Sequence, residues 1–174
     1  MITAKLLLVY LLQSTDVSGL STIDTTQIDP QEAYCLAENI YYEAGGEETR
    51  GQFAVASVTL NRAKDARFPS TVCGVVKQST RSRFTDKLVC AFSWYCNSEK
   101  KGREIPVNNR DGSINQRVTD QFRRASIVAI TALAGNVKDE SRGATHFHNP
   151  YTSNPAWTRD MRKTASLGNH DFYK

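Results

Sequence analysis

The chain has 174 residues, of which 40% are hydrophobic and 23% charged, so it is long enough for one globular domain with a substantial core. It contains no run of about 18 apolar residues, which argues against a conventional membrane-spanning helix. Residues 1–34 carry one base and four acids, whereas residues 35–174 carry 21 bases and 14 acids, a formal charge of +7. A basic body either attracts a polyanion, such as nucleic acid or an anionic cell wall, or is an ordinary soluble surface.

The chain begins with a short apolar segment. Residues 6–12 are all apolar and follow Lys5, and the small residues Val17-Ser18-Gly19 come shortly afterwards. We interpret residues 1–30 as an N-terminal segment that forms a core or surface helix. An export signal or a membrane anchor is the alternative. Residues 14–30 are rich in Ser, Thr and Asp and are typical of a linker.

Regular structure is predicted to begin at Asp29, and residues 31–174 are expected to form one folded domain. Asp29 is a typical N-cap, Pro30 suits the first helical position, and Glu32 stands three residues after the cap. Apolar residues then recur at helical spacing, at Ala33, Leu36, Ala37, Ile40 and Ala44. Gly45 and Gly46 are predicted to end this helix.

The rest of the chain predicts further helices and little sheet. Residues 51–63 indicate a largely buried helix, and residues 68–78 a turn followed by a short helix. Residues 79–118 lack periodicity and are expected to form a long irregular excursion, which in a compact domain is usually functional or mobile. Residues 118–133 predict a helix closed by Gly135, and residues 144–148 a short strand. The expected fold class is mainly α (α+β), a compact domain with small β elements.

The glutamates of the first helix can be sorted by helical angle. If Leu36 defines zero, Glu38 falls at about 200°, on the solvent side, and Glu43 at about −20°, at the margin of the apolar stripe. Partial burial would raise the pKa of Glu43, so that it could donate a proton, as in glycoside cleavage. A buried Glu that only hydrogen-bonds its neighbours is the alternative. On geometry alone, Glu47 caps the next helix or orients Glu43.

The four cysteines, at positions 35, 73, 90 and 96, include no CxxC pair or zinc-finger spacing. An even number permits two disulfides, with three pairings, in an oxidising compartment. Buried free thiols fit the sequence equally well.

Six segments in order carry a resemblance to a known family. They are "LAENIYYEAGGEETRGQFAVASVTLNR", "FPSTVCGVV", "AFSWYCN", "GATHFHNP", "PAWTRDM" and "LGNHDFYK". Together they resemble the SleB-type cell wall hydrolases, known from spore-cortex-lytic enzymes, bacterial envelope proteins and phage lysins, over about residues 33–173. The chain departs from the family at Gly45, where the family often has Arg, and this puts in doubt any substrate contact made by that arginine.

The resemblance implies a lysozyme- or transglycosylase-like fold and cleavage of peptidoglycan between N-acetylmuramic acid and N-acetylglucosamine. It implies that Glu43 is the catalytic acid and that Glu47 supports it. Such enzymes typically act as lytic transglycosylases, in which the muramoyl C6 hydroxyl closes a 1,6-anhydro ring. This chemistry needs one acid, no cofactor and no metal. Hydrolysis would use the same acid.

The resemblance also implies which residues surround the glycan. The indole of Trp94 would stack on a sugar, although a core Trp is the alternative, and the segment "GATHFHN" would form a wall of the cleft. Independently of the resemblance, Cys90 and Cys96 bracket this region and could close a small loop, in which case Cys35 and Cys73 would join the two early elements. The expected substrate-binding residues are Tyr42, Ser93, Trp94, His146, Phe147, His148 and Asn149.

Two other classes of function stay open. His146 and His148 share a face if they lie on a strand, as the metal ligands of a zinc amidase would. A non-catalytic module that binds the wall through its basic clusters is the other. No nucleic-acid recognition motif is visible, so we expect no nucleic-acid partner.

The expected partner is the glycan strand of peptidoglycan, contacted by a monomer. We expect at most transient membrane association, through residues 2–13. A catalytic domain that fills nearly the whole chain favours a phage endolysin that attacks a Gram-negative host. The site of action would be the cell envelope or periplasm, or the wall reached from an infected cytoplasm.

Overall fold

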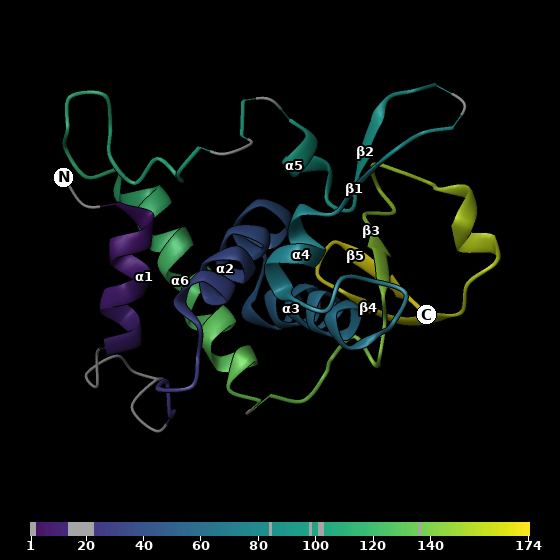
Figure 1. The fold of residues 1–174 in the computed structure, drawn as a ribbon, viewed down its shortest axis with the longest axis horizontal. Coiled ribbons are helices and arrows are strands. Elements are labelled where there is room, and N and C mark those ends of the chain that lie inside the picture. The colour runs from purple at the N-terminus through teal and green to yellow at the C-terminus, as the bar shows by residue number, and fades with distance from the viewer. Residues whose placement is uncertain (1–2, 14–22, 84, 98, 101–102, 136) are drawn as a thin grey trace.

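The computed structural model describes residues 3–13, 23–83, 85–97, 99–100, 103–135 and 137–174. Helices dominate the described chain, and the longer strands lie near its C-terminal end (Figure 1). The mainly α (α+β) class predicted from the sequence is confirmed. In the described residues, none of the helices combines the length and apolar character needed to cross a membrane.

Helix α2 (Pro30–Ala44) lies at the centre of the molecule (Figure 1). Its predicted start is confirmed, because the Asp29 carboxylate accepts a hydrogen bond from the Gln31 N–H at 2.7 Å. Glu32 does not turn back to its own helix. Instead, its Oε2 accepts the Val72 N–H at 2.6 Å, which fixes the start of α4 (Val72–Lys77) against α2.

Three further helices pack on α2. These are α1 (Ala4–Gln13), α3 (Thr49–Lys64) and α6 (Gln116–Leu133), and all contribute to the hydrophobic core. The predicted helices therefore all form, each within a few residues of its expected bounds. Gly135 follows α6 with a φ of +76°, the left-handed conformation predicted for a closing glycine.

The apolar N-terminal segment is part of this core. Ala4, Leu8 and Leu11 on α1 are buried at 1% exposure or less, while Leu6 is exposed. The Thr25 hydroxyl donates to the Leu12 carbonyl at 2.8 Å and ties the segment before α2 to the end of α1. Residues 4–13 therefore form a helix that packs into the core. Most of the predicted linker, residues 14–22, lies outside the described residues.

A small antiparallel sheet covers one end of α3. Its strands are β3 (His146–His148), β5 (His170–Tyr173) and β4 (Lys163–Leu167), in the order β3-β5-β4. The predicted strand at residues 144–148 is confirmed as β3. The buried ring of Phe172 joins the sheet to a second apolar cluster with Val55 and Val58 of α3. A 3₁₀ turn, η1 (Ala156–Arg159), leads into β4.

The segment predicted as wholly irregular, residues 79–118, contains regular structure. A hairpin of β1 (Ser79–Arg81) and β2 (Leu88–Cys90) projects from the body, and a short helix, α5 (Ser93–Cys96), follows (Figure 1). The prediction was wrong because each strand has three residues, nearly all exposed, and so shows no burial pattern.

Two disulfides brace these elements. Cys35–Cys73 joins α2 to α4, and Cys90–Cys96 closes the loop that carries residues 91–93. The pairing suggested by the positions of the cysteines is confirmed, and none of the four thiols is free.

Candidate active site

Glu43 lies in the last turn of α2, at the edge of the buried face. It is half-buried, as its angle on the helix predicts, and lines a cavity of about 280 Å³ that we call the Glu43 cavity. The other walls come from the segment between β2 and α5, from β3 and its following turn, and from single residues of α3 and β5. They are Arg62, Cys90, Ala91, Phe92, Ser93, Phe147, His148, Asn149, Ser153 and His170.

The electrostatics of the cavity suit an acid. Burial raises the pKa of Glu43, and the nearby charges of His170, Arg62 and Lys100 offset part of that rise. A carboxyl group in this setting holds its proton to a higher pH than an exposed Glu and still has cations nearby when the proton leaves. This combination is required of a group that gives up a proton and later takes one back.

Glu47 contacts His170, which lines the Glu43 cavity. A carboxylate oxygen of Glu47, Oε1, lies 2.9 Å from His170 Nδ1, and both side chains are 7% exposed. The same oxygen accepts the Asn169 N–H at 3.3 Å. Glu47 does not line the Glu43 cavity, whereas His170 does. Glu47 therefore lies behind His170, where it can position the imidazole ring. The sequence did not single out His170.

The space around Glu47 depends on two glycines. A Cβ atom at Gly51 or at Gly168 would collide with Glu47 Oε2. Oε2 is also buried without a hydrogen-bond partner among the described residues. Close packing by these glycines thus holds the Glu47 carboxylate against His170.

The predicted glycan-binding residues divide into two sets. Ser93, Phe147, His148 and Asn149 line the Glu43 cavity. Trp94 does not, because its ring is 5% exposed and stacks on Tyr42 at 4.5 Å, and its Nε1–H donates to Asn39 Oδ1 at 2.9 Å. Trp94 and Tyr42 therefore pack against each other and do not line the Glu43 cavity.

His146 belongs to an adjoining cavity of about 330 Å³, which we call the Trp157 cavity. Arg62, Cys90 and Ala91 line both cavities. The remaining walls of the Trp157 cavity are Phe68, Gln78, Ser79, Thr80, Val89 and Trp157.

The two histidines of β3 share a face, as predicted, and both rings contact Trp157. His148 is engaged on both ring nitrogens, with the Ser153 carbonyl at 3.0 Å and the Tyr173 hydroxyl at 3.3 Å. Across the part of the chain that the structure describes, no group of three or more His, Cys, Asp or Glu residues is arranged to hold a metal ion.

Arg62 is a site residue that the sequence analysis missed. It lies near the end of α3, it is 6% exposed, and its Nε–H donates to the Thr145 carbonyl at 2.6 Å. The available signal was its spacing, because Arg62 follows the buried residues Val55 and Val58 at helical intervals. A charged residue on an apolar stripe is unusual and indicates a partner or a ligand.

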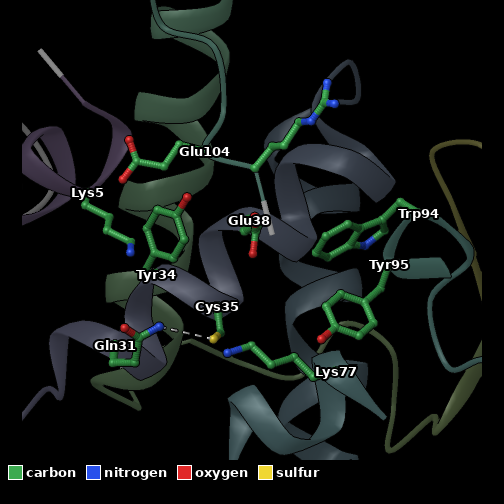
Figure 2. A pocket seen from close by; sticks show the side chains of 10 residues that line it. Lys5, Gln31, Tyr34, Cys35, Glu38, Lys77, Trp94, Tyr95 and Glu104 are labelled. Carbon is green, nitrogen blue, oxygen red and sulfur yellow. Dashed lines mark hydrogen bonds between the residues drawn. The ribbon is translucent and has the colours of Figure 1, made fainter. Parts of the chain in front are cut away.

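The prediction that Glu38 lies on the solvent side of α2 is wrong. It is half-buried, not solvated, and burial raises its pKa to about 7 in spite of the nearby charges of Lys77 and Lys5. Glu38 is shielded because residues of α1, α4 and α5 line a pocket on the face of α2 that was expected to meet water. Figure 2 shows Glu38 in a pocket between α1 and α5, which we call the Glu38 pocket. Its lining residues are Lys5, Gln31, Tyr34, Cys35, Glu38, Lys77, Trp94, Tyr95, Arg103 and Glu104.

Comparison with known proteins gives a family match. A sequence model of the family described as Cell Wall Hydrolase matches residues 46–173, starting three residues after Glu43. The spore cortex-lytic enzyme of Oceanobacillus iheyensis is 29% identical over 160 residues, and that of Halalkalibacterium halodurans is 31% identical over 137 residues. These matches cover 91% and 79% of this chain, but 48% and 33% of the relatives. The chain thus spans about half or less of the length of these curated relatives.

Two solved structures resemble the fold. The catalytic domain of the germination-specific lytic transglycosylase SleB from Bacillus anthracis is 25% identical, with a TM-score of 0.57, over 86% of this chain and 98% of that domain. The catalytic domain of the Bacillus cereus SleB protein is 28% identical, with a TM-score of 0.53, over 83% of this chain and 91% of that domain. The resemblance predicted from the six sequence segments is confirmed.

Proposed function

Because the chain belongs to the Cell Wall Hydrolase family, we propose that it degrades peptidoglycan by cleaving the bond between N-acetylmuramic acid and N-acetylglucosamine, with Glu43 as the acid. The observation that carries this proposal is the place of Glu43, a half-buried carboxyl group with a raised pKa in a cavity that Arg62 and His170 also line. A carboxyl group in such a place fits a general acid for glycoside cleavage.

The proposed reaction is a lytic transglycosylation. Glu43 gives its proton to the glycosidic oxygen, and the bond from that oxygen to the muramoyl C1 breaks. The C6 hydroxyl oxygen of the same muramoyl residue then bonds to C1, and its proton passes to the Glu43 carboxylate. The products are a 1,6-anhydromuramoyl end and a free hydroxyl on N-acetylglucosamine, and Glu43 ends in its starting state.

The surrounding residues have supporting roles in this proposal. Arg62 and His170 stabilise the Glu43 carboxylate during the interval when its proton is on the leaving sugar. Glu47 holds His170 at the cavity wall. Ser93 and Asn149 supply polar groups to the cavity for the sugar. Action at the cell wall follows from the substrate, while the role in phage lysis and the monomeric state stay predictions from the sequence.

The assignment of Glu43 is tested by Glu43→Gln, which keeps the shape and removes the proton donor. Loss of a general acid typically costs a factor of about 10² to 10⁴ in rate, so we expect no measurable fall in the turbidity of a peptidoglycan suspension. Glu48→Gln, at an exposed position five residues further on, is the control and should lyse like the wild type. Near-normal lysis by a folded Glu43→Gln protein would refute the role of Glu43.

The bond and the chemistry are tested by mass spectrometry of the digested peptidoglycan. A 1,6-anhydromuramoyl product is expected. A reducing muramic acid end would show hydrolysis in place of transglycosylation. A free lactyl carboxylate with released peptide would show amidase action and would overturn the proposed bond.

A further inference from the structure

The Trp157 cavity adjoins the Glu43 cavity and has no part in the reaction described above. The two share Arg62 and the backbone segment at Cys90 and Ala91, so a substrate group leaving the Glu43 cavity on this side passes the Arg62 guanidinium. The following inference rests on the proposed function, because it concerns what the peptidoglycan substrate places in this second cavity.

Arg62 has much unused binding capacity. A guanidinium has five N–H donors, and in the described residues Arg62 makes one hydrogen bond, from Nε to the Thr145 carbonyl. Its Nη1 is buried without a partner, and no carboxylate lies within ion-pair distance among the described residues. The rings of Phe68 and Phe92 hold the guanidinium carbon at 5.4 and 5.1 Å. A buried charge with unmade hydrogen bonds is costly, so this position favours an oxygen ligand, above all an anionic one.

The charges around the Trp157 cavity also favour an anionic ligand. None of its lining residues is acidic. Burial lowers the pKa of His146, and the charges of Arg62 and Arg67 lower it further, which shows that positive potential reaches the cavity. The carboxyl group that interacts electrostatically with Arg62 is Glu43, whose protonated form is favoured by burial. Neutral sugars would leave this potential uncompensated.

The chemistry of muramic acid supplies an anion at the right place. Its ring carries a lactyl group on O3, in the same residue whose bond from C1 to the glycosidic oxygen is cleaved. The lactyl carboxyl group is either free or linked to a short peptide that has carboxylates of its own. The cavity offers Gln78, Ser79 and Thr80 as polar contacts and the rings of Phe68 and Trp157 as apolar ones.

We propose that the Trp157 cavity is a binding site for the carboxylate carried on the lactyl arm of muramic acid, with Arg62 as its principal ligand. The carboxylate comes either from the lactyl group itself or from the attached peptide. The cavity thereby selects muramoyl residues that bear an anionic arm and places their C1 atom against Glu43.

The test uses three forms of one short glycan. In the first the lactyl group carries its peptide, in the second its carboxylate is free, and in the third it is a neutral methylamide. For the wild-type enzyme, we expect kcat/KM for at least one anionic form to exceed that for the neutral form by about tenfold, because a charged hydrogen bond to a desolvated guanidinium is lost in the third. The anionic form that is preferred identifies the source of the carboxylate.

Two variants at one exposed position isolate the effect of charge. Thr80→Glu places a carboxylate at the cavity wall, and Thr80→Gln has the same shape without the charge. We expect Thr80→Glu to lower the ratio of anionic to neutral cleavage about fivefold relative to Thr80→Gln, and salt to weaken this difference. Leu88→Glu, on the same hairpin but outside both cavities, should keep the wild-type ratio.

The outcomes separate the two proposals. If the wild-type enzyme cleaves none of the three glycans at the expected bond, the proposed function fails. If it cleaves all three equally well, and Thr80→Glu and Thr80→Gln do not differ, then the proposed function stands and the anionic site is refuted.

Discussion

Two glutamates on α2 show how much a single residue's surroundings decide. The sequence predicted the burial of Glu43 from its angle on the helix, and the structure agrees. Glu38 lies on the opposite face of α2, which was expected to meet solvent, but residues of α1 and α5 line a pocket around it. Helical angle tells which residues share a face, but only the tertiary structure tells what lies opposite that face.

The burial of Glu38 predicts a pH-dependent stability. Folding raises its pKa to about 7, so the proton is held more tightly in the folded state, and the stabilisation is lost as pH rises through this value. Glu38→Gln has no proton to lose. At pH 8 we expect its free energy of unfolding to exceed that of the wild type by about 1 to 2 kcal/mol, after allowance for partial exposure, and its unfolding temperature to be higher. At pH 4 we expect the two proteins to be equally stable. Thermal denaturation at both pH values measures this, and an unchanged difference between them would contradict it.

Substitution of Gly168 is expected to lower kcat as well as stability. Gly168 has a φ of +58°, and a Cβ atom there would meet Glu47 Oε2. Gly168→Ala should lose about 1 to 2 kcal/mol through backbone strain and should also displace Glu47 from His170, with a fall in kcat of about tenfold.

A second glycine separates these two effects. Gly112 has a φ of +87° but open space around it. Gly112→Ala should therefore lose a similar amount of stability and keep its kcat. Equal activities in the two variants, measured well below their unfolding temperatures, would contradict a role for the packing around Glu47.

At the scale of elements, the sequence predicted the helices well and the sheet poorly. The cap at Asp29 and the closing glycine after α6 gave strong local signals, and both are confirmed. The hairpin of β1 and β2 and the strands β4 and β5 gave none, because their strands are short and are stabilised by pairing with residues that the sequence alone does not identify.

The packing of α1 predicts that this helix contributes to stability and not to the chemical step. Leu8 is 1% exposed, and Leu8→Ala should cost about 2 to 5 kcal/mol in the free energy of unfolding. Leu6 is 57% exposed on the same helix, and Leu6→Ala should change stability by less than about 0.5 kcal/mol. Urea denaturation measures both, and comparable midpoints for the two variants would show that α1 is not docked as described.

At the scale of the whole molecule, the site is a product of long-range folding. His170 lies far along the chain from Glu47, yet the two side chains are in contact, and the Thr145 carbonyl accepts the hydrogen bond from Arg62 on α3. No pattern among neighbouring residues in the sequence predicts contacts between residues so far apart in the chain. From the sequence, helical angle and family resemblance pointed to Glu43, and the resemblance pointed to Glu47, but neither signal pointed to Arg62 or His170.

The uneven charge of the chain predicts a dependence on salt. Residues 35–174 have 21 bases and 14 acids, so the folded body attracts an anionic wall. We expect the initial rate of lysis to fall several-fold between about 0.02 and 0.3 M NaCl, because the Debye length shortens from about 20 Å to less than 6 Å. Turbidity measurements at fixed pH test this, with a short soluble glycan as the control that should be less affected. A rate independent of salt would contradict electrostatic attraction.

The central helix α2 also limits how the chain can change in length during evolution. It presents Glu38 to one pocket and Glu43 to another, and it holds Cys35 against α4 through a disulfide. One residue added or removed between these positions would turn the rest of the helix by about 100°, taking Glu43 out of its cavity. Substitutions can accumulate within residues 30–44, but insertions and deletions there would be eliminated. Length differences among relatives should instead gather in the surface loops, such as the tip of the hairpin between β1 and β2.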